Sequence, residues 1–339
     1  MAESSEPQKE TPRKRPSLRV RVLLMLVATF AALLAGEAAV RVRHYLKHGT
    51  FGPIYEFEID EESGLRVPPV GENGSITINQ RQFRGPEIEV PKPDGRLRIA
   101  FLGGSTTFCA EASADDKVWP HLVAQGLDGH FGGRSVDYVN GGAAGFDSGS
   151  SKKNLEIRMR DLEPDLVVIY HATNDFSKDA AEQAAEQGFD VSFSRSWLAR
   201  RSMLFSLIEK NLLLSSRSGE DVEKIEVDLD AIVEKFEARL RALIMSSKER
   251  ADAVAIATFA HRMRAGQSEA ELQKNAKTAL LYVPFLRLED IVEGMDRCNE
   301  LIRRLAVELE VVLTDEIDHI PADAEQYNDS VHFTDAGCQ

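Results

Sequence analysis

The chain has 339 residues, of which 43% are hydrophobic, so it can bury the core of one α/β domain and still carry additional segments. Its 55 acidic residues outnumber the 41 basic ones, and the formal charge of −14 argues against binding to nucleic-acid phosphates. Neither the eight histidines nor the three cysteines show metal-ligand spacing, and an odd number of thiols cannot all pair. We expect no nucleic acid, metal or cofactor, and buried or unreactive thiols at Cys109, Cys298 and Cys338.

The N-terminal residues are basic, with six Lys and Arg against three Glu before Val22. Residues 1–21 are predicted to form a disordered cytoplasmic tail. The apolar run at 22–40 follows, and at a rise of about 1.5 Å per residue it nearly crosses a hydrocarbon core of about 30 Å. Because more positive charge precedes this run than follows it, the rest of the chain is predicted to lie in the periplasm or outside the cell.

An uncleaved transmembrane anchor is the favoured interpretation of residues 22–40, and two alternatives stay open. One is a buried helix of a soluble domain, although no amphipathic stripe is visible. The other is a cleavable signal peptide with a small-residue site at 36–38, after which the protein would be secreted. The acidic Glu37 in that site and the length of the run favour the anchor.

Residues 41–95 carry turn signals rather than helical periodicity, such as Gly-Pro at 52–53 and Asn-Gly at 73–74. They are predicted to be a membrane-proximal extension of short strands and loops. From residue 96 onward the pattern changes, and apolar runs alternate with helical stripes. Five runs are consistent with strands buried on both faces: 97–102, 136–139, 166–170, 254–259 and 311–313.

Helical stripes lie over 155–162, 232–244 and 286–309, between the predicted strands. Their alternation with strands predicts a mostly parallel sheet covered by helices on both faces, in a domain over 96–339. Two long insertions, at 176–228 and 261–284, are expected at the carboxyl edge of this sheet as lids or substrate walls. For the first insertion a helical hairpin packed on the core is an equal alternative.

Small and polar residues follow three of the predicted strands. Ser105 comes behind two glycines after the first strand, the glycine-rich residues 140–145 follow the second, and Asn174 follows the third. The pair Asp329-x-x-His332 stands near the end of the chain. Because the carboxyl ends of parallel strands meet at one edge, this layout is typical of a hydrolytic triad in an open α/β sheet.

These blocks resemble the SGNH hydrolase superfamily, also called the GDSL esterases and lipases, over residues 96–337. The resemblance implies a flavodoxin-like three-layer α/β/α fold with a five-stranded parallel sheet. It also implies a catalytic triad of Ser105, Asp329 and His332. An oxyanion hole would consist of the backbone N–H groups of Ser105 and Gly145 and the side-chain amide of Asn174. The stretch 78–85 resembles the lead-in of membrane-anchored bacterial members.

The sequence departs from the family pattern in three places. Gly104 stands where the family name has aspartate, and Ala172 stands where glycine is usual, so its methyl group is expected to narrow the site. The family's terminal helix after the histidine is expected to be missing, which would expose sheet surface and loosen His332.

Other polar residues near these blocks receive structural interpretations first. Asp147 or Ser148 is expected to cap a helix. His171 is expected to be a structural histidine whose ring nitrogens have hydrogen-bond partners, with substrate contact as the alternative. His261 and Arg262 follow the fourth strand and could bind an acidic substrate, with an ordinary salt bridge as the default.

The sequence thus predicts an anchored serine esterase or lipase-like hydrolase that forms an acyl-enzyme on Ser105. Carboxylic esters are the expected substrates, and the location alone suggests O-acetyl groups of envelope glycans. Two alternatives stay open. One is an O-acyltransferase that uses the same triad to acylate a sugar hydroxyl, and the other is a catalytically inactive envelope-binding module.

Overall fold

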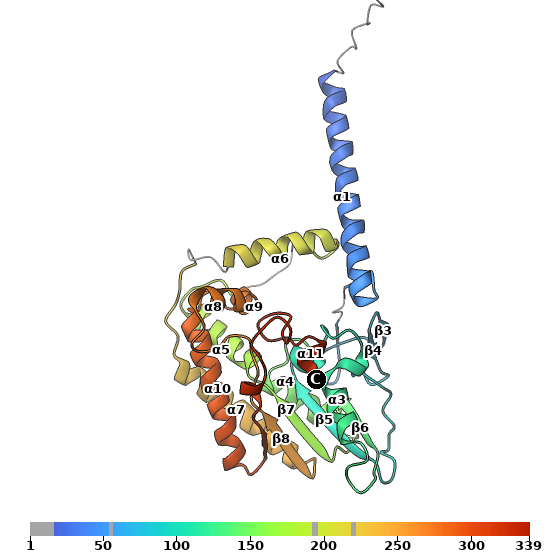
Figure 1. Cartoon of the computed structure of the whole chain (residues 1–339), viewed down its shortest axis with the longest axis vertical. Coiled ribbons are helices and arrows are strands. Elements are labelled where there is room, and N and C mark those ends of the chain that lie inside the picture. Colours follow the sequence, from blue (N-terminus) through green and yellow to red (C-terminus); the bar gives the residue numbers. More distant parts are fainter. Residues whose placement is uncertain (1–16, 54–56, 192–195, 218–221) are drawn as a thin grey trace, which may run out of the picture.

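A five-stranded parallel sheet forms the centre of the computed structural model, which describes residues 17–53, 57–191, 196–217 and 222–339 (Figure 1). The strand order is β6-β5-β7-β8-β9, and β5 pairs in parallel with both β6 and β7. This order confirms the predicted fold class. Most of the predicted tail lies outside the described residues. The strands are β5 (Leu97–Gly103), β6 (Val136–Asn140), β7 (Leu166–Tyr170), β8 (Ala253–Ala257) and β9 (Val312–Thr314).

Strand β8 ends two residues before the predicted boundary because the backbone beyond it bonds to a side chain. The N–H of Phe259 donates to Asn299 Oδ1 at 2.7 Å, and Asn299 Nδ2 donates back to the Phe259 carbonyl at 3.1 Å. Phe259 is still buried in the main core. The apolar run at 254–259 therefore predicted the buried residues correctly, but the strand is shorter than the run.

Helices cover both faces of the sheet. On one face Ala100 and Leu102 of β5 belong to the main core cluster together with the apolar stripes of α7 and α10. On the other face Phe101 packs with Ala124 of α3. The 155–162 stripe is only partly helical. Helix α4 continues as a π-helical turn, η2, which ends at Arg158, before the end of the stripe. These helices are α3 (Trp119–Leu127), α4 (Ser148–Lys153), η2 (Asn154–Arg158), α5 (Thr173–Glu186), α7 (Leu229–Lys248) and α10 (Leu288–Glu308).

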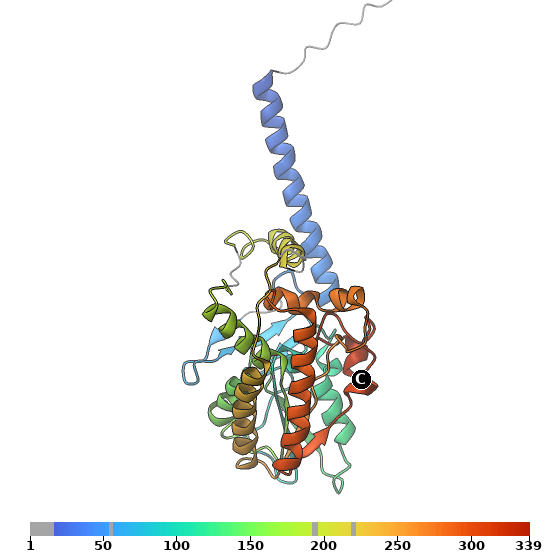
Figure 2. The ribbon, with the colours of Figure 1, turned by 90° about the vertical axis from the view of Figure 1, so that its left-hand side faces the viewer.

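The long N-terminal helix α1 (Leu18–His48) projects from the domain and extends beyond the predicted 22–40 at both ends (Figures 1 and 2). Ser17 caps its start, and Gly49 ends it in the left-handed conformation with φ 73°. None of its residues is buried. In the described part of the chain, α1 is the one helix whose length and composition would allow it to cross a membrane.

The two insertions differ in how they pack. The first begins as α5, whose Phe176 and Ala180 lie in the main core, and continues to α6 (Met203–Arg217), which packs against α1 and α9 instead. The predicted hairpin on the core is therefore found only for the α5 part. The second insertion forms α8 (Glu269–Asn275) and α9 (Lys277–Tyr282). Figure 1 shows α6, α8 and α9 at the end of the domain that faces α1.

The extension between α1 and β5 forms two short antiparallel pairs and then supports the first helix after β5. Arg84 is fully buried, and its Nη1 donates to the carbonyl of Phe108 at 2.9 Å, at the end of α2 (Ser105–Phe108). Its Nε donates to Asp115 at 2.8 Å. The pairs are β1 (Glu58–Ile59) with β2 (Arg66–Val67), and β3 (Gly71–Asn73) with β4 (Ile76–Ile78).

We predict that Arg84→Met lowers the free energy of unfolding by roughly 2 to 4 kcal/mol, because it removes charge-assisted hydrogen bonds from buried carbonyls and from Asp115. Arg81→Met is the matched control. It breaks an exposed ion pair with Asp161 and should cost no more than about 1 kcal/mol. Chemical denaturation of the full chain in detergent measures both. Equal losses in the two variants would contradict the supporting role of Arg84.

Candidate active site

Ser105 lies at the carboxyl end of β5, where the chain turns at once into α2. The two residues before Ser105 must be glycines because neighbouring side chains occupy the space that a Cβ atom would need. A Cβ on Gly103 would lie 2.0 Å from Thr107 Oγ1, and one on Gly104 would lie 2.5 Å from Asn174 Nδ2. Glycine at the position of the family's aspartate therefore lets Asn174 approach the serine loop closely.

A hydrogen-bond chain joins the three residues of the predicted triad. His332 Nε2 lies 2.8 Å from Ser105 Oγ, and its Nδ1 lies 2.9 Å from Asp329 Oδ2. The other carboxylate oxygen of Asp329 accepts the backbone N–H groups of Val331 and His332, both at 2.9 Å. Asp329 therefore fixes both the imidazole and the turn that carries it.

Electrostatics at the site favour the imidazolium form. Burial opposes protonation of His332, but the hydrogen bond to Asp329 and the negative charges of Glu111 and Asp329 outweigh it and raise its pKa to about 9. Burial also opposes ionisation of Asp329, yet its hydrogen bonds to His332 and to two backbone N–H groups lower its pKa. The pair is thus set up to hold a positive charge on the ring next to Ser105.

Ser330, between the aspartate and the histidine, fixes this loop to the second insertion. It is 1% exposed, and its hydroxyl donates to the carbonyl of Asn275 at 2.7 Å while accepting the N–H of Ala279 at 3.2 Å. Its own carbonyl accepts the N–H of Arg262 at 2.8 Å. The 261–284 insertion therefore holds the histidine loop in place, a role that the sequence analysis missed.

The glycine-rich block after β6 forms a tight turn beside Ser105. The N–H of Phe146 donates to the carbonyl of Ala143 at 3.1 Å, and Gly145 has φ 82°, which is unfavourable for other residues. Gly145 is exposed at this corner. A Cβ on Gly142 would lie 2.5 Å from the backbone nitrogen of Phe108, so this glycine permits close packing on α2.

Asn174 lies in the first turn of α5, directly after β7. One of its amide hydrogens is donated to the carbonyl of Phe146 at 2.9 Å, which orients the group. A primary amide has two N–H donors, so the second can serve a ligand at Ser105. The structure therefore brings Ser105, Gly145 and Asn174 to the same edge of the sheet.

Ala172 and the segment after His332 behave differently from expectation. Ala172 is 1% exposed and belongs to the main core, so the expected narrowing of the site is not found. After the histidine the chain forms α11 (Asp335–Cys338). Asp335 accepts the N–H of Ser113 at 2.8 Å, and Cys338 is buried beside Cys109. These contacts hold the segment, so the expected loosening of His332 is not found either.

The remaining polar candidates have structural partners. Asp147 caps α4 by accepting the N–H of Ser150 at 2.7 Å, as predicted. Ser148 is buried and its hydroxyl donates to Asp175 at 3.1 Å. His171 is buried against Ser151 Oγ at 2.8 Å, and burial lowers its pKa.

His261 does not supply the positive charge that an acidic substrate would require. His261 is fully buried, and burial lowers its pKa to about 3, so it carries no positive charge at neutral pH. Arg262 contributes its backbone N–H and carbonyl to the packing of the second insertion. All three cysteines are buried free thiols, as expected.

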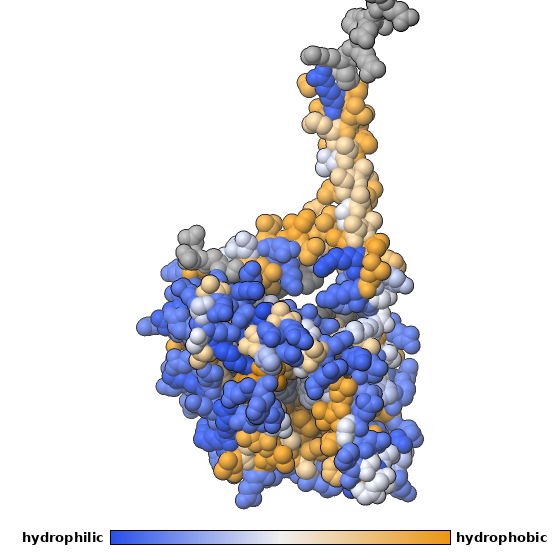
Figure 3. All heavy atoms as spheres, in the orientation of Figure 1, coloured by the Kyte–Doolittle hydropathy of each residue, from blue (hydrophilic) through white to orange (hydrophobic). Residues whose placement is uncertain are grey.

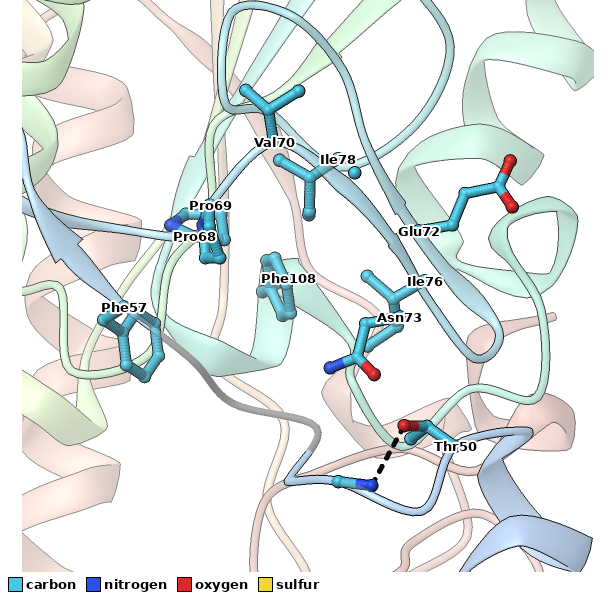
Figure 4. Close-up of a pocket in the computed structure, with 12 residues that line it drawn as sticks. Thr50, Phe57, Pro68, Pro69, Val70, Glu72, Asn73, Ile76, Ile78 and Phe108 are labelled. Carbon is cyan, nitrogen blue, oxygen red and sulfur yellow. Dashed lines mark hydrogen bonds between the residues drawn. The ribbon is translucent and has the colours of Figure 1, made fainter.

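A cavity of about 400 Å³ lies in the extension, behind α2 rather than at the triad (Figure 4). Phe57, Val70 and Ile76 line it together with Phe108, the last residue of α2. Its lining residues do not include Ser105. This cavity is therefore separate from the edge of the sheet where Ser105, Gly145 and Asn174 lie.

The chain matches one sequence family and is similar to several solved structures. A sequence model of the GDSL-like lipase/acylhydrolase family matches residues 101–339. No protein with a curated function matches the chain by sequence. Among solved structures, an acetylxylan esterase from Geobacillus stearothermophilus is similar at a TM-score of 0.41 and 17% identity, covering 71% of this chain and 89% of that one. Another acetyl xylan esterase has a TM-score of 0.41 at 15% identity, covering 71% and 94%. A two-domain esterase active on acetylated mannans has 0.38 at 17%, covering 72% and 45%.

We predict that the imidazole of His332 titrates near pH 9 and that Asp329→Asn lowers this pKa. A raised pKa means that the ring is protonated below about pH 9 and neutral above it, and the variant removes the negative partner that stabilises the protonated form. NMR titration of the ring signals measures both values, with His332→Gln used for assignment. An unchanged pKa in Asp329→Asn would contradict the control by Asp329.

Proposed function

The chain belongs to the GDSL-like lipase/acylhydrolase family, and on this premise we propose that it cleaves carboxylic esters with Ser105 as the nucleophile. The observation that carries the proposal is the hydrogen-bond chain from Ser105 through His332 to Asp329, at 2.8 and 2.9 Å. Hydrogen bonds of this length allow the imidazole to take the serine proton as the hydroxyl attacks. Such a complete chain also argues against the inactive binding module.

The reaction proceeds in two halves. Ser105 Oγ attacks the ester carbonyl carbon while its proton passes to His332 Nε2, and Asp329 stabilises the imidazolium. The imidazolium then gives the proton to the departing alcohol, which leaves an acyl-serine. A water molecule gives a proton to His332 and attacks the acyl carbon, and the released serine oxygen takes that proton back as the acid departs. Because the neutral ring is the base, the active fraction grows as the pH rises toward about 9.

The developing oxyanion has three donors available. They are the backbone N–H of Ser105 at the start of α2, the backbone N–H of Gly145 in its turn, and the free N–H of the Asn174 amide. Preorganised donors of this kind are effective because they need no reorientation during the reaction. Loss of one typically reduces the rate by about 10² to 10³.

We assign α1 as an uncleaved membrane anchor with the N-terminus in the cytoplasm. Glu37 supports retention because it is bound to the folded domain: it accepts the N–H of Leu204 at 2.8 Å and the hydroxyl of Ser202 at 2.7 Å. Cleavage near residue 36 would remove the apolar segment and would disrupt the place where Gly36 lies next to Leu204. The excess of basic residues before the apolar run supports a catalytic domain in the periplasm or outside the cell.

O-acetyl groups of envelope glycans are the substrate class that this location supports. A domain held at the outer side of a membrane meets the glycans of the envelope, and acetyl esters are among the carboxylic esters that these polymers carry. Gly145 is exposed at this edge of the sheet, which supports access for a polymeric substrate.

We predict that a fluorophosphonate labels the wild-type chain and fails to label Ser105→Ala. The reagent requires a serine activated by a base, and the 2.8 Å contact between His332 Nε2 and Ser105 Oγ supports this role for Ser105. Ser148→Ala is the matched control, because Ser148 is buried and bonded to Asp175 and should leave labelling in place. A folded wild-type chain that remains unlabelled would overturn the nucleophile assignment.

For the substrate class, we predict that the wild-type chain releases acetate from O-acetylated envelope glycans and that Ser105→Ala releases none. Acetate release is compared with hydrolysis of p-nitrophenyl acetate by the same preparation. Turnover of the nitrophenyl ester alone would refute the glycan class and leave the esterase intact. Appearance of acetyl groups on an added sugar acceptor, without free acetate, would identify the acyltransferase instead.

A further inference from the structure

The helix α6 exposes an apolar face that the folded domain does not cover. Leu207, Ile208 and Leu212 lie on one side of this helix, and Leu212 is 65% exposed. The turn before α6 continues the surface with Leu198 and with Trp197, which is 59% exposed. These five residues form the apolar face of α6. Figure 3 shows hydrophobic residues gathered over α6 and continuing onto α1.

The position of α6 relative to α1 is fixed by direct contacts. The N–H groups at the start of α6 donate to Glu37, from Met203 at 3.1 Å and from Leu204 at 2.8 Å. A carboxylate at a helix N-terminus accepts hydrogen bonds from N–H groups that have no partner within the helix. Its negative charge also interacts favourably with the positive end of the helix dipole. Gly36 allows Leu204 to approach closely, since a Cβ there would lie 3.0 Å from Leu204 Cδ2. Figures 1 and 2 show α6 beside α1 and running across its axis.

This junction lies where the hydrocarbon layer would end. Arg21 and Glu37 bound the apolar part of α1. Sixteen residue steps separate them, or about 24 Å of helix, and charged side chains that extend toward the headgroups fit this length to a core of about 30 Å. A helix joined at Glu37 and running across α1 therefore lies in the plane of the membrane surface.

The charges around α6 are those of a lipid-facing segment. Residues 196–217 hold four basic residues and one acidic residue, although the whole chain has a charge of −14. Arg200, Arg201 and Lys210 are exposed, and the Arg201 guanidinium lies 4.9 Å from the centre of the Trp197 ring. Basic residues beside Trp and Leu are typical of helices that lie in the headgroup region.

We infer that α6 and the turn before it form an interfacial helix, whose apolar face inserts into the phospholipid surface that α1 enters. The inference rests on α1 being retained in the bilayer. It places the catalytic edge of the sheet directly beneath the membrane surface, because α6 packs on α9 and Lys210 is among the charges that act on His332. The domain then contacts the membrane at two places, with α6 parallel to its surface.

The test uses the fluorescence of Trp197 in the full chain, reconstituted into vesicles of phosphatidylcholine and phosphatidylglycerol. The lipids are brominated either near the carbonyl end or near the methyl end of their acyl chains. The emission of the Trp197→Phe variant is subtracted to remove Trp119, the only other tryptophan. We expect the Trp197 signal to fall at least about twofold with bromine near the carbonyl end, and less with bromine near the methyl end.

The triple variant Leu207→Ser, Ile208→Ser, Leu212→Ser should lose most of this quenching. The control Phe131→Ser, Val307→Ser, Val312→Ser removes exposed apolar side chains outside α6, each 48% exposed or more, and should keep the quenching. Activity toward a soluble ester in detergent checks that each variant is folded.

Three outcomes would overturn the inference. Trp197 could remain unquenched while the chain floats with the vesicles, which would refute the role of α6 and leave the anchor intact. Trp197 could be shielded in a particle with the mass of two chains, which would identify a second copy as the partner. A chain that does not float with vesicles would refute the anchor and the interfacial helix together.

Discussion

The contact between Ser105 and His332 joins residues 227 positions apart, and the surrounding structure serves to hold its two sides still. On the serine side, Arg84 binds the carbonyl of Phe108 at the end of α2, and Asn140 donates to the carbonyl of Thr107 within it. The histidine side depends on buried hydrogen bonds of its own loop. A hydrogen bond near 2.8 Å tolerates little movement, so both supports must be rigid for this contact to persist.

The sheet and the candidate site could be predicted from local patterns. Buried parallel strands appear in the sequence as uninterrupted apolar runs, and the residues that follow them meet at one edge by topology alone. That rule predicts that Ser105, Asn174 and the Gly145 turn lie together. Asp329 and His332 follow no predicted strand, so their connection with Ser105 rested on the typical layout of a hydrolytic triad and on the family resemblance.

Features that depend on tertiary partners could not be predicted. Ser330 looks like any loop serine, and its importance comes from where α8 and α9 pack. His261 seemed available to substrate because it follows a strand, yet the fold buries it completely. Ala172 and Gly104 depart from the family pattern, and the sequence does not show the effect of either change. In the structure Ala172 lies in the main core, and Gly104 leaves room for Asn174. The interpretation of α6 likewise needed the contact with Glu37, which lies 167 positions from Leu204.

That contact also begins a series of hydrogen bonds between α1 and the histidine loop. Glu37 joins α1 to α6, Arg217 of α6 donates to the carbonyl of Leu281 in α9 at 2.8 Å, and the N–H of Ala279 in α9 reaches Ser330. In the proposed anchored state, α1 is therefore connected to the histidine loop through hydrogen bonds as well as through the chain itself. A catalytic domain held in this proposed way would act on esters near the membrane surface, and more distant esters would have to diffuse to it.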